Sequence, residues 1–257
     1  MKQTVKTPGV VLEAGPYRSS GVLAVIYTEE LGAVSVISSN ARKPSSPAGA
    51  MLNRIAIIEM VLHGSGDLFT LKNASLVRDF PSIHSSAHKA LAAAYLFDLI
   101  KHASPRGDSD SRMFAFLTAG LEAMNTAADR FRDIVTLTRA YEIKMLYVCG
   151  ILPVFERCVS CGCAYHGGFY VSLRGGYVCT RCAQPNERIL RLPAELMQAL
   201  VRLVHEPLAA SIKNPLTQIM ADRMKLIIQP TLFQFFGKRP ASAAVLETGE
   251  RDLPRDD

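Results

Sequence analysis

The sequence has no long apolar run and no tryptophan, and aromatic residues make up only 7% of its 257 positions. The scarcity of aromatic residues decides little by itself. The longest apolar run, from Met145 to Phe155, contains Gly150 and Pro153 and is too short to cross a bilayer. The N-terminal residues also lack the apolar segment of a secretory signal peptide. Together these absences predict a cytoplasmic protein without a membrane partner.

The common sequence signatures of catalysis are missing as well. The chain has no Walker A loop, no Gly-x-Gly-x-x-Gly, no Gly-x-Ser-x-Gly and no His-Glu-x-x-His. Carboxylates that could hold catalytic metal ions are not clustered, since Glu29 and Glu30 stand alone and Asp108 and Asp110 lie in a polar loop before a helix. We therefore expect a binding protein that is not an enzyme and has no catalytic residues.

The composition supports a folded protein with a moderately basic surface. Hydrophobic residues make up 49% of the chain, which is enough for one large domain or for two to three small ones. The net charge of +6 and the isoelectric point near 9.1 fit a nucleic-acid partner, although many housekeeping enzymes are equally basic.

Two Cys-x-x-Cys pairs are the most informative motif. Cys158 and Cys161 form the first pair, Cys179 and Cys182 form the second, and 17 residues separate them. This spacing is typical of a four-thiolate zinc site. The residues from Phe169 to Val178 are β-formers around a Gly-Gly turn, which predicts a hairpin with both cysteine pairs at its open end, as in a zinc ribbon.

The other interpretations of these cysteines explain less. Disulfides would need an oxidising compartment, and a redox Cys-x-x-Cys would leave the second pair without a role. Cys163 is expected to point away from the closed knuckle, and Cys149 to be a small buried residue near a helix end. Four cysteine ligands leave no open coordination position, so we expect one structural zinc ion. Its tetrathiolate complex would lower the formal charge of +6 to roughly +4.

The first 81 residues read as a small β-barrel domain. Five segments rich in Val, Ile, Leu, Thr or Tyr alternate with turn signals: Val5–Leu12, Val22–Tyr27, Ala33–Ser38, Arg54–Leu62 and Leu68–Phe80. Five short strands of this spacing predict an OB-fold barrel, whose loops commonly hold single-stranded nucleic acid.

The loop from Asn40 to Pro47 is the candidate nucleic-acid contact of this barrel. It holds the adjacent cations Arg42 and Lys43, which could contact phosphates, and hydroxyl groups such as that of Ser45. A solvated loop without such a role is an equally good interpretation. Further cations proposed for DNA binding are Lys6, Arg18 and Arg54. Tyr17 and Tyr27 are candidates for base stacking, although core packing fits Tyr27 better.

From residue 82 to residue 240 the pattern becomes helical, with the zinc motif inserted at 155–188. The strongest helical stripe runs from Phe131 to Cys149 and ends at Gly150. Its opposite face carries Arg130, Arg132, Arg139 and Lys144, which we interpret as a solvated helix face, with a DNA-binding stripe as the alternative. The residues from 241 to 257 are acidic and are expected to be a disordered tail. The predicted fold class is α+β multidomain.

Five segments, in order along the chain, resemble sequences of the bacterial recombination mediator family RecO. Thr28–Val36 is similar to TEELGKVSV, Ala41–Ser46 to the family's basic loop, Gly66–Leu71 to GDLYTL, Tyr141–Gly150 to FELRLLALLGY and Gly175–Cys182 to GGVLCxxC. The resemblance covers residues from about 4 to 235. Some family members lack the cysteines, which agrees with a structural role for zinc.

The resemblance implies a role in DNA repair and recombination. A protein of this family would bind single- and double-stranded DNA and anneal complementary strands. With RecR it would help load RecA onto DNA coated by single-strand binding protein, whose C-terminal tail would dock on the helical domain. It would be associated with the nucleoid. The alternative is a zinc-ribbon protein with an OB domain that binds or modifies RNA.

Overall fold

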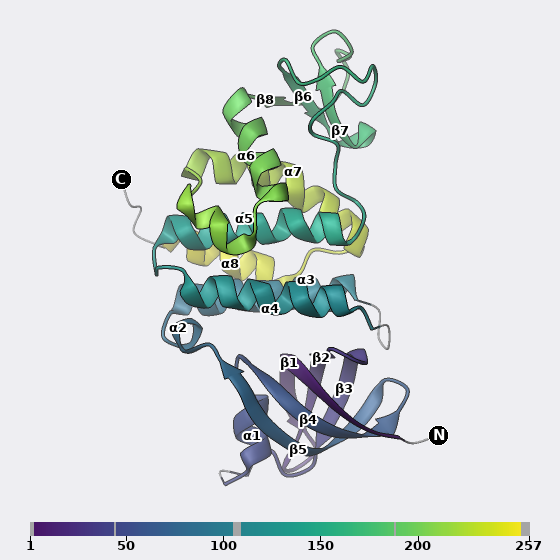
Figure 1. Ribbon diagram of the computed structural model, residues 1–257, viewed down its shortest axis with the longest axis vertical. Coiled ribbons are helices and arrows are strands. Elements are labelled where there is room, and N and C mark those ends of the chain that lie inside the picture. The colour runs from purple at the N-terminus through teal and green to yellow at the C-terminus, as the bar shows by residue number, and fades with distance from the viewer. Residues whose placement is uncertain (1–2, 44, 105–108, 188, 253–257) are drawn as a thin grey trace. The chain divides into compact units, whose positions relative to one another are not determined.

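The computed structural model describes residues 3–43, 45–104, 109–187 and 189–252, with only the backbone given for residues 247–252 (Figure 1). Pro44 of the predicted basic loop, Asp108 and residues 253–257 of the predicted tail lie outside this range. The chain divides into two compact units. The barrel unit comprises Met1–Thr126 and Pro240–Gly249, and the ribbon unit comprises Ala127–Arg239 and Glu250–Asp257.

The barrel unit begins with five strands that close into a barrel in the order β1-β2-β3-β5-β4 (Figure 1). The strands are β1 (Gln3–Tyr17), β2 (Gly21–Thr28), β3 (Gly32–Ser38), β4 (Ala56–Ser65) and β5 (Leu68–Asp79). Only β3 and β5 pair in parallel, and β1 is long enough to pair with both β2 and β4. The predicted five-stranded OB-type barrel is confirmed.

Alternating side chains explain why these segments become barrel strands. In β4 every second residue is buried from Ala56 to Gly64, and the residues between them are partly exposed. Alternation with period two places one set of side chains inside the barrel and the other outside. The inward set includes Ile26, Val36, Ile58, Met60 and Phe69, which pack into one hydrophobic core.

Helices complete the barrel unit, and one of them corrects a prediction. These helices are α1 (Pro47–Leu52), α2 (Pro81–His84), α3 (Ala87–Ala103), α4 (Ser111–Thr126) and α8 (Ala241–Asp252). The prediction of disorder from residue 241 is wrong for α8. Ala243 and Leu246 are buried, and the Ser242 hydroxyl donates to Asp98 Oδ2 at 2.7 Å. The acidic composition of the tail hid two apolar positions that one face of a helix can bury.

The ribbon unit combines three helices with a small sheet. Its helices are α5 (Phe131–Val148), α6 (Ala194–His205) and α7 (Gln218–Phe236), with a short 3₁₀ turn at Leu208–Lys213. The sheet has the strand order β7-β6-β8, formed by β7 (Gly176–Cys179), β6 (Gly168–Val171) and β8 (Ile189–Leu192). No helix in the part of the chain that the structure describes is long and apolar enough to span a membrane.

The predicted solvated face is only partly correct, because Arg130 is exposed and pairs with Asp133, whereas Arg139 and Lys144 are engaged inside the unit. Arg139 is almost fully buried, and its Nε lies 3.2 Å from Oε2 of the buried Glu142. Gln229 of α7 donates to the other oxygen of Glu142 at 2.9 Å. Lys144 donates to the carbonyl oxygen of Val204 at 2.9 Å. Lys144 therefore holds α5 to α6, and the Arg139–Glu142 pair within α5 is joined to α7 through Gln229, so Arg139 offers no surface to DNA.

We predict that Arg139→Met destabilises the ribbon unit by about 3–5 kcal/mol, because it leaves the Glu142 carboxylate buried without its cation. Adding Glu142→Leu should recover most of this loss, since neither charge of the buried pair then remains. Urea unfolding measures both effects. Arg112→Met is the control, because its pair with Asp110 is exposed, and its unfolding midpoint should not move. Equal stabilities of Arg139→Met and the double variant would contradict the prediction.

Candidate metal centre and nucleic-acid interface

The hairpin predicted between the cysteine pairs is formed by β6 and β7. Gly168 at the start of β6 pairs with Cys179 at the end of β7. The first cysteine pair lies beside this open end, because the Val159 amide donates to the Tyr177 carbonyl oxygen at 2.9 Å. The hairpin therefore brings two segments that are far apart in the sequence to one place.

Each cysteine pair is closed by a tight turn of the backbone. In the first turn the Gly162 amide donates to the Cys158 carbonyl oxygen at 2.8 Å, and Gly162 adopts a positive φ of 74° that suits glycine. In the second turn the Cys182 amide donates to the Cys179 carbonyl oxygen at 3.0 Å. Such turns direct both sulfur atoms of a pair to the same side.

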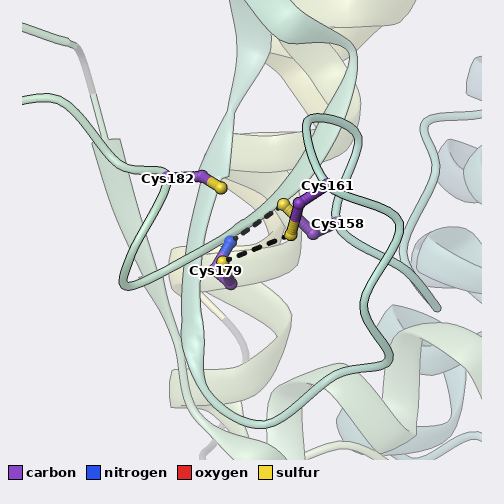
Figure 2. Close-up of side chains that lie close together, drawn as sticks. All are labelled: Cys158, Cys161, Cys179 and Cys182. Carbon is purple, nitrogen blue, oxygen red and sulfur yellow. Dashed lines mark hydrogen bonds between the residues drawn. The ribbon is translucent and has the colours of Figure 1, made fainter.

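The four predicted ligands meet at one point (Figure 2). All four sulfur atoms lie within 4.8 Å of one another, and Cys161 Sγ is 3.8 Å from Cys179 Sγ. Tetrahedral zinc with Zn–S bonds of about 2.3 Å separates its sulfur ligands by roughly 3.8 Å. Cys158 and Cys179 are buried, whereas Cys161 is exposed and Cys182 is partly exposed. The cluster could thus hold a zinc-like ion with the two buried cysteines at its base.

The pKa values of the cysteines in the cluster shift in opposite directions. Burial disfavours the thiolate of Cys158, but amide donors, beginning with that of Cys179, outweigh it and lower the Cys158 pKa to about 6. Hydrogen bonds from Cys182 to the sulfurs of Cys179 and Cys161 raise the Cys182 pKa to about 12. Sulfurs this close cannot all be ionised while no cation lies between them. The donor set therefore fits a divalent ion that would replace the shared protons.

The orientation of Cys163 differs from the prediction. Its Sγ does not point away from the cluster but lies 3.4 Å from Cys161 Sγ and 3.7 Å from His166 Nδ1. The cause is the Cys158 amide, which donates to the Cys163 carbonyl oxygen at 2.8 Å and folds the chain back over the first pair. Counting residues from Cys161 could not have found this turn. It also brings in His166, which the spacing of the cysteines did not indicate.

The second candidate site is a pocket of about 470 Å³ at one end of the barrel. Arg42 and Lys43 line it together with Gly15 and Pro16 of β1 and with Gly49 and Ala50 of α1. Both cations are exposed, and neither has an acidic partner within the described residues. No carboxylate is among the described residues that line the pocket. The pocket is therefore suited to an anion.

Helix α1 fixes the position of the loop that precedes it and carries Arg42 and Lys43, the cationic loop. The Ser46 hydroxyl caps the helix by accepting the Gly49 amide at 3.3 Å, and Asn53 donates to the Gly49 carbonyl oxygen at 2.9 Å. A β-carbon at Gly49 would lie 1.9 Å from the carbonyl oxygen of Ala41, so only glycine lets the loop pack this closely. The sequence suggested a loop up to Pro47, whereas Pro47 is the first residue of this helix.

The other predicted DNA contacts are not all in one place. The Ser20 carbonyl oxygen accepts the Arg42 amide at 3.0 Å, which holds the β1–β2 turn with Arg18 next to the cationic loop. Ser45 is exposed in the loop itself but does not line the pocket. Lys6 pairs with Glu59 and Arg54 pairs with Asp79, each at 3.0 Å. These last two cations are partly neutralised and lie outside the pocket.

The two tyrosines considered for base stacking have different environments. Tyr27 is fully buried, so it is a core residue. Tyr17 is half-buried at the end of β1, and the Arg18 guanidinium carbon lies 5.1 Å from its ring centre. Of the two, only Tyr17 is placed where a base could reach it. Asn53 and Pro16, which also line the pocket, were not found from the sequence because they carry no charge or motif.

We predict that the purified protein holds one zinc ion and that a chelator which removes it lowers the melting temperature by more than about 5 °C, because the metal-bound form is then no longer favoured. Differential scanning calorimetry and metal analysis measure this. The cysteines of the cluster should react faster with a thiol reagent once zinc is removed. Cys149 should react slowly throughout, because burial raises its pKa to about 11. Melting that is unchanged by the chelator, with restored zinc as the control, would contradict a structural ion.

Comparisons with known proteins cover both units. The family model described as "Recombination protein O N terminal" matches residues 1–80, and "Recombination protein O C terminal" matches residues 84–239. The DNA repair protein RecO of Caldicellulosiruptor saccharolyticus is 26% identical over 88% of this chain and 93% of its own length. That of Anaeromyxobacter sp. strain K is 28% identical, over 95% and 96%. The chain belongs to the RecO family of DNA repair and recombination proteins.

Proposed function

We propose that this protein is a recombination mediator without enzymatic activity. It binds single- and double-stranded DNA, anneals complementary strands and, together with RecR, helps load RecA onto DNA coated by single-strand binding protein. It does so in the cytoplasm at the nucleoid and docks the C-terminal tail of single-strand binding protein on its helical part. Membership of the RecO family supports a role in DNA repair and recombination. DNA binding, strand annealing and the partners are what the resemblance implies.

The observation that carries DNA binding is the cationic pocket of the barrel. Arg42 and Lys43 have no internal ion pair in the described chain, so phosphates can take that place without breaking an existing contact. Phosphate binding releases counterions from DNA, which supplies affinity that does not depend on sequence. Bringing two complementary strands together needs their repulsion to be screened, and cations achieve this without covalent chemistry.

One zinc ion held by Cys158, Cys161, Cys179 and Cys182 has a structural role in this proposal. Four thiolates fill a tetrahedral coordination sphere, so no position remains for water or substrate. The ion would fix the two cysteine turns and so hold the short strands of the ribbon together. Catalysis by this ion is therefore not part of the proposed function.

We predict that Arg42→Gln with Lys43→Gln weakens binding of single-stranded DNA and flattens its dependence on salt. The slope of log K against log salt is negative, and removing two phosphate contacts should make it less steep by about 1.4. Fluorescence anisotropy at several salt concentrations measures the slope. Lys6→Gln with Arg54→Gln removes the same charge from ion-paired positions and should leave the slope nearly unchanged. Equal slopes for both double variants would exclude the pocket as the site.

The proposed function is tested by strand annealing on DNA coated with single-strand binding protein. We expect the full-length protein to accelerate annealing and the Arg42→Gln, Lys43→Gln variant to accelerate it less, because it holds phosphates more weakly. Fluorescence of a donor–acceptor pair on the two strands follows the reaction. No acceleration by the wild-type protein would count against a mediator. Tighter binding of RNA than of DNA of the same sequence would favour the RNA-binding alternative.

A further inference from the structure

The cysteine cluster contains one more thiol than a tetrahedral ion needs. Five sulfur atoms lie in the ribbon's cluster, because Cys163 turns towards it and approaches Cys161 to 3.4 Å. A second group of possible ligands is formed by Cys163, His166 and Cys179, whose ligand atoms also lie within 4.8 Å of one another. Cys179 belongs to both groups. Two thiolates and one imidazole are ligands that zinc commonly accepts.

The loop that carries Cys163 and His166 is held in place independently of the first cysteine pair's sulfur atoms. The Tyr177 hydroxyl accepts the His166 amide at 3.3 Å and donates to the Gly167 carbonyl oxygen at 2.9 Å. The Tyr165 hydroxyl donates to the Leu192 carbonyl oxygen at 2.6 Å. These contacts anchor the C-terminal end of the loop, residues 165–167, to Tyr177 of β7 and to the end of β8. The second group is thus fixed near Cys179 even if an exposed ligand is lost.

The imidazole is placed as a reserve ligand and not as a resident one. His166 Nδ1 lies 2.9 Å from the Ala164 carbonyl oxygen, so this nitrogen can bind a metal only by giving up that contact. The exposure of the cysteines in the first group indicates which resident ligands are the easiest to lose. Cys161 and Cys182 are the accessible members of the first group, and accessible thiolates are the first to be oxidised or displaced.

We propose that Cys163 and His166 form a second ligand set for the single ion, which replaces Cys161 when that ligand is lost, with Cys179 as the ligand common to both sets. The inference rests on the proposed zinc site and adds to it a way of keeping the ion. An associative exchange needs an entering ligand next to the leaving one, and the contact between Cys161 and Cys163 supplies it. The ion then changes partners without leaving the protein.

The test compares cobalt binding by full-length variants, since Co²⁺ reports its ligands through visible absorption. Cys161→Ser should bind cobalt within about tenfold of the wild-type affinity, because Cys163, which lies beside Cys161, completes the site. Cys161→Ser with Cys163→Ser should bind at least about 100-fold more weakly, comparable to loss of supporting contacts in metal sites or worse. Cys163→Ser alone should resemble wild type. Cys179→Ser should lose the ion, because it removes the shared ligand.

Each outcome separates this inference from the zinc site itself. A wild-type protein that binds no cobalt or zinc would overturn both. If wild type binds one ion but Cys161→Ser binds as poorly as its double variant with Cys163→Ser, the reserve set is excluded and the four-cysteine site stands. Two ions per wild-type chain would also overturn the exchange, since both groups would then be filled at once. Circular dichroism checks that each variant is folded. The comparison between the variants with and without Cys163→Ser remains valid even if Cys179→Ser unfolds.

Discussion

Repulsion among closely spaced thiolates is the constraint on which the ribbon depends. Its three strands have only four residues each, too few to support a core of their own. Two of the four cysteines in the cluster, Cys158 and Cys179, are buried. Without a cation the group must keep protons: burial and the neighbouring sulfurs of Cys161 and Cys179 raise the pKa of Cys163 to about 12, and hydrogen bonds with the same two sulfurs raise that of Cys182 to about 12. A divalent ion would convert this repulsion into attraction and turn a weak hairpin into a fixed insert.

The positive charges of the chain serve two different purposes. On α5 they are internal: Arg139 contacts Glu142, and Lys144 contacts a backbone carbonyl. At the end of the barrel Arg42 and Lys43 line a pocket without an acidic neighbour among the described residues. A net charge of +6 therefore says little about where an anion binds. The distribution of ion pairs says more, because a cation already neutralised gains little from a phosphate.

The sequence predicted features that follow from a simple period or spacing. The five barrel strands follow from alternation, and the hairpin follows from its β-formers. Its connection is not the predicted Gly-Gly turn but a 3₁₀ turn at Ser172–Arg174 followed by Gly175, and Gly176 is already paired in β7. The convergence of the four cysteines was predicted from the Cys-x-x-Cys spacing. The burial of Arg139 could not be predicted, because helical period shows which residues share a face but not what covers it. Cys163 was misplaced because a single backbone hydrogen bond decides its direction, and α8 because composition conceals two buried positions.

The chemistry of the barrel pocket also bears on which nucleic acids it suits. Two of its uncharged polar groups are already engaged, since the Ser46 hydroxyl accepts the Gly49 amide and the Asn53 side-chain amide donates to the Gly49 carbonyl oxygen. Recognition of base identity needs donors and acceptors directed at base edges, whereas phosphates need only positive charge. The charged side chains of the described pocket lining are Arg42 and Lys43, and small residues such as Gly15 and Pro16 form part of its wall. In the proposed function such a surface would hold strands of any sequence, which is what annealing of arbitrary complementary strands requires.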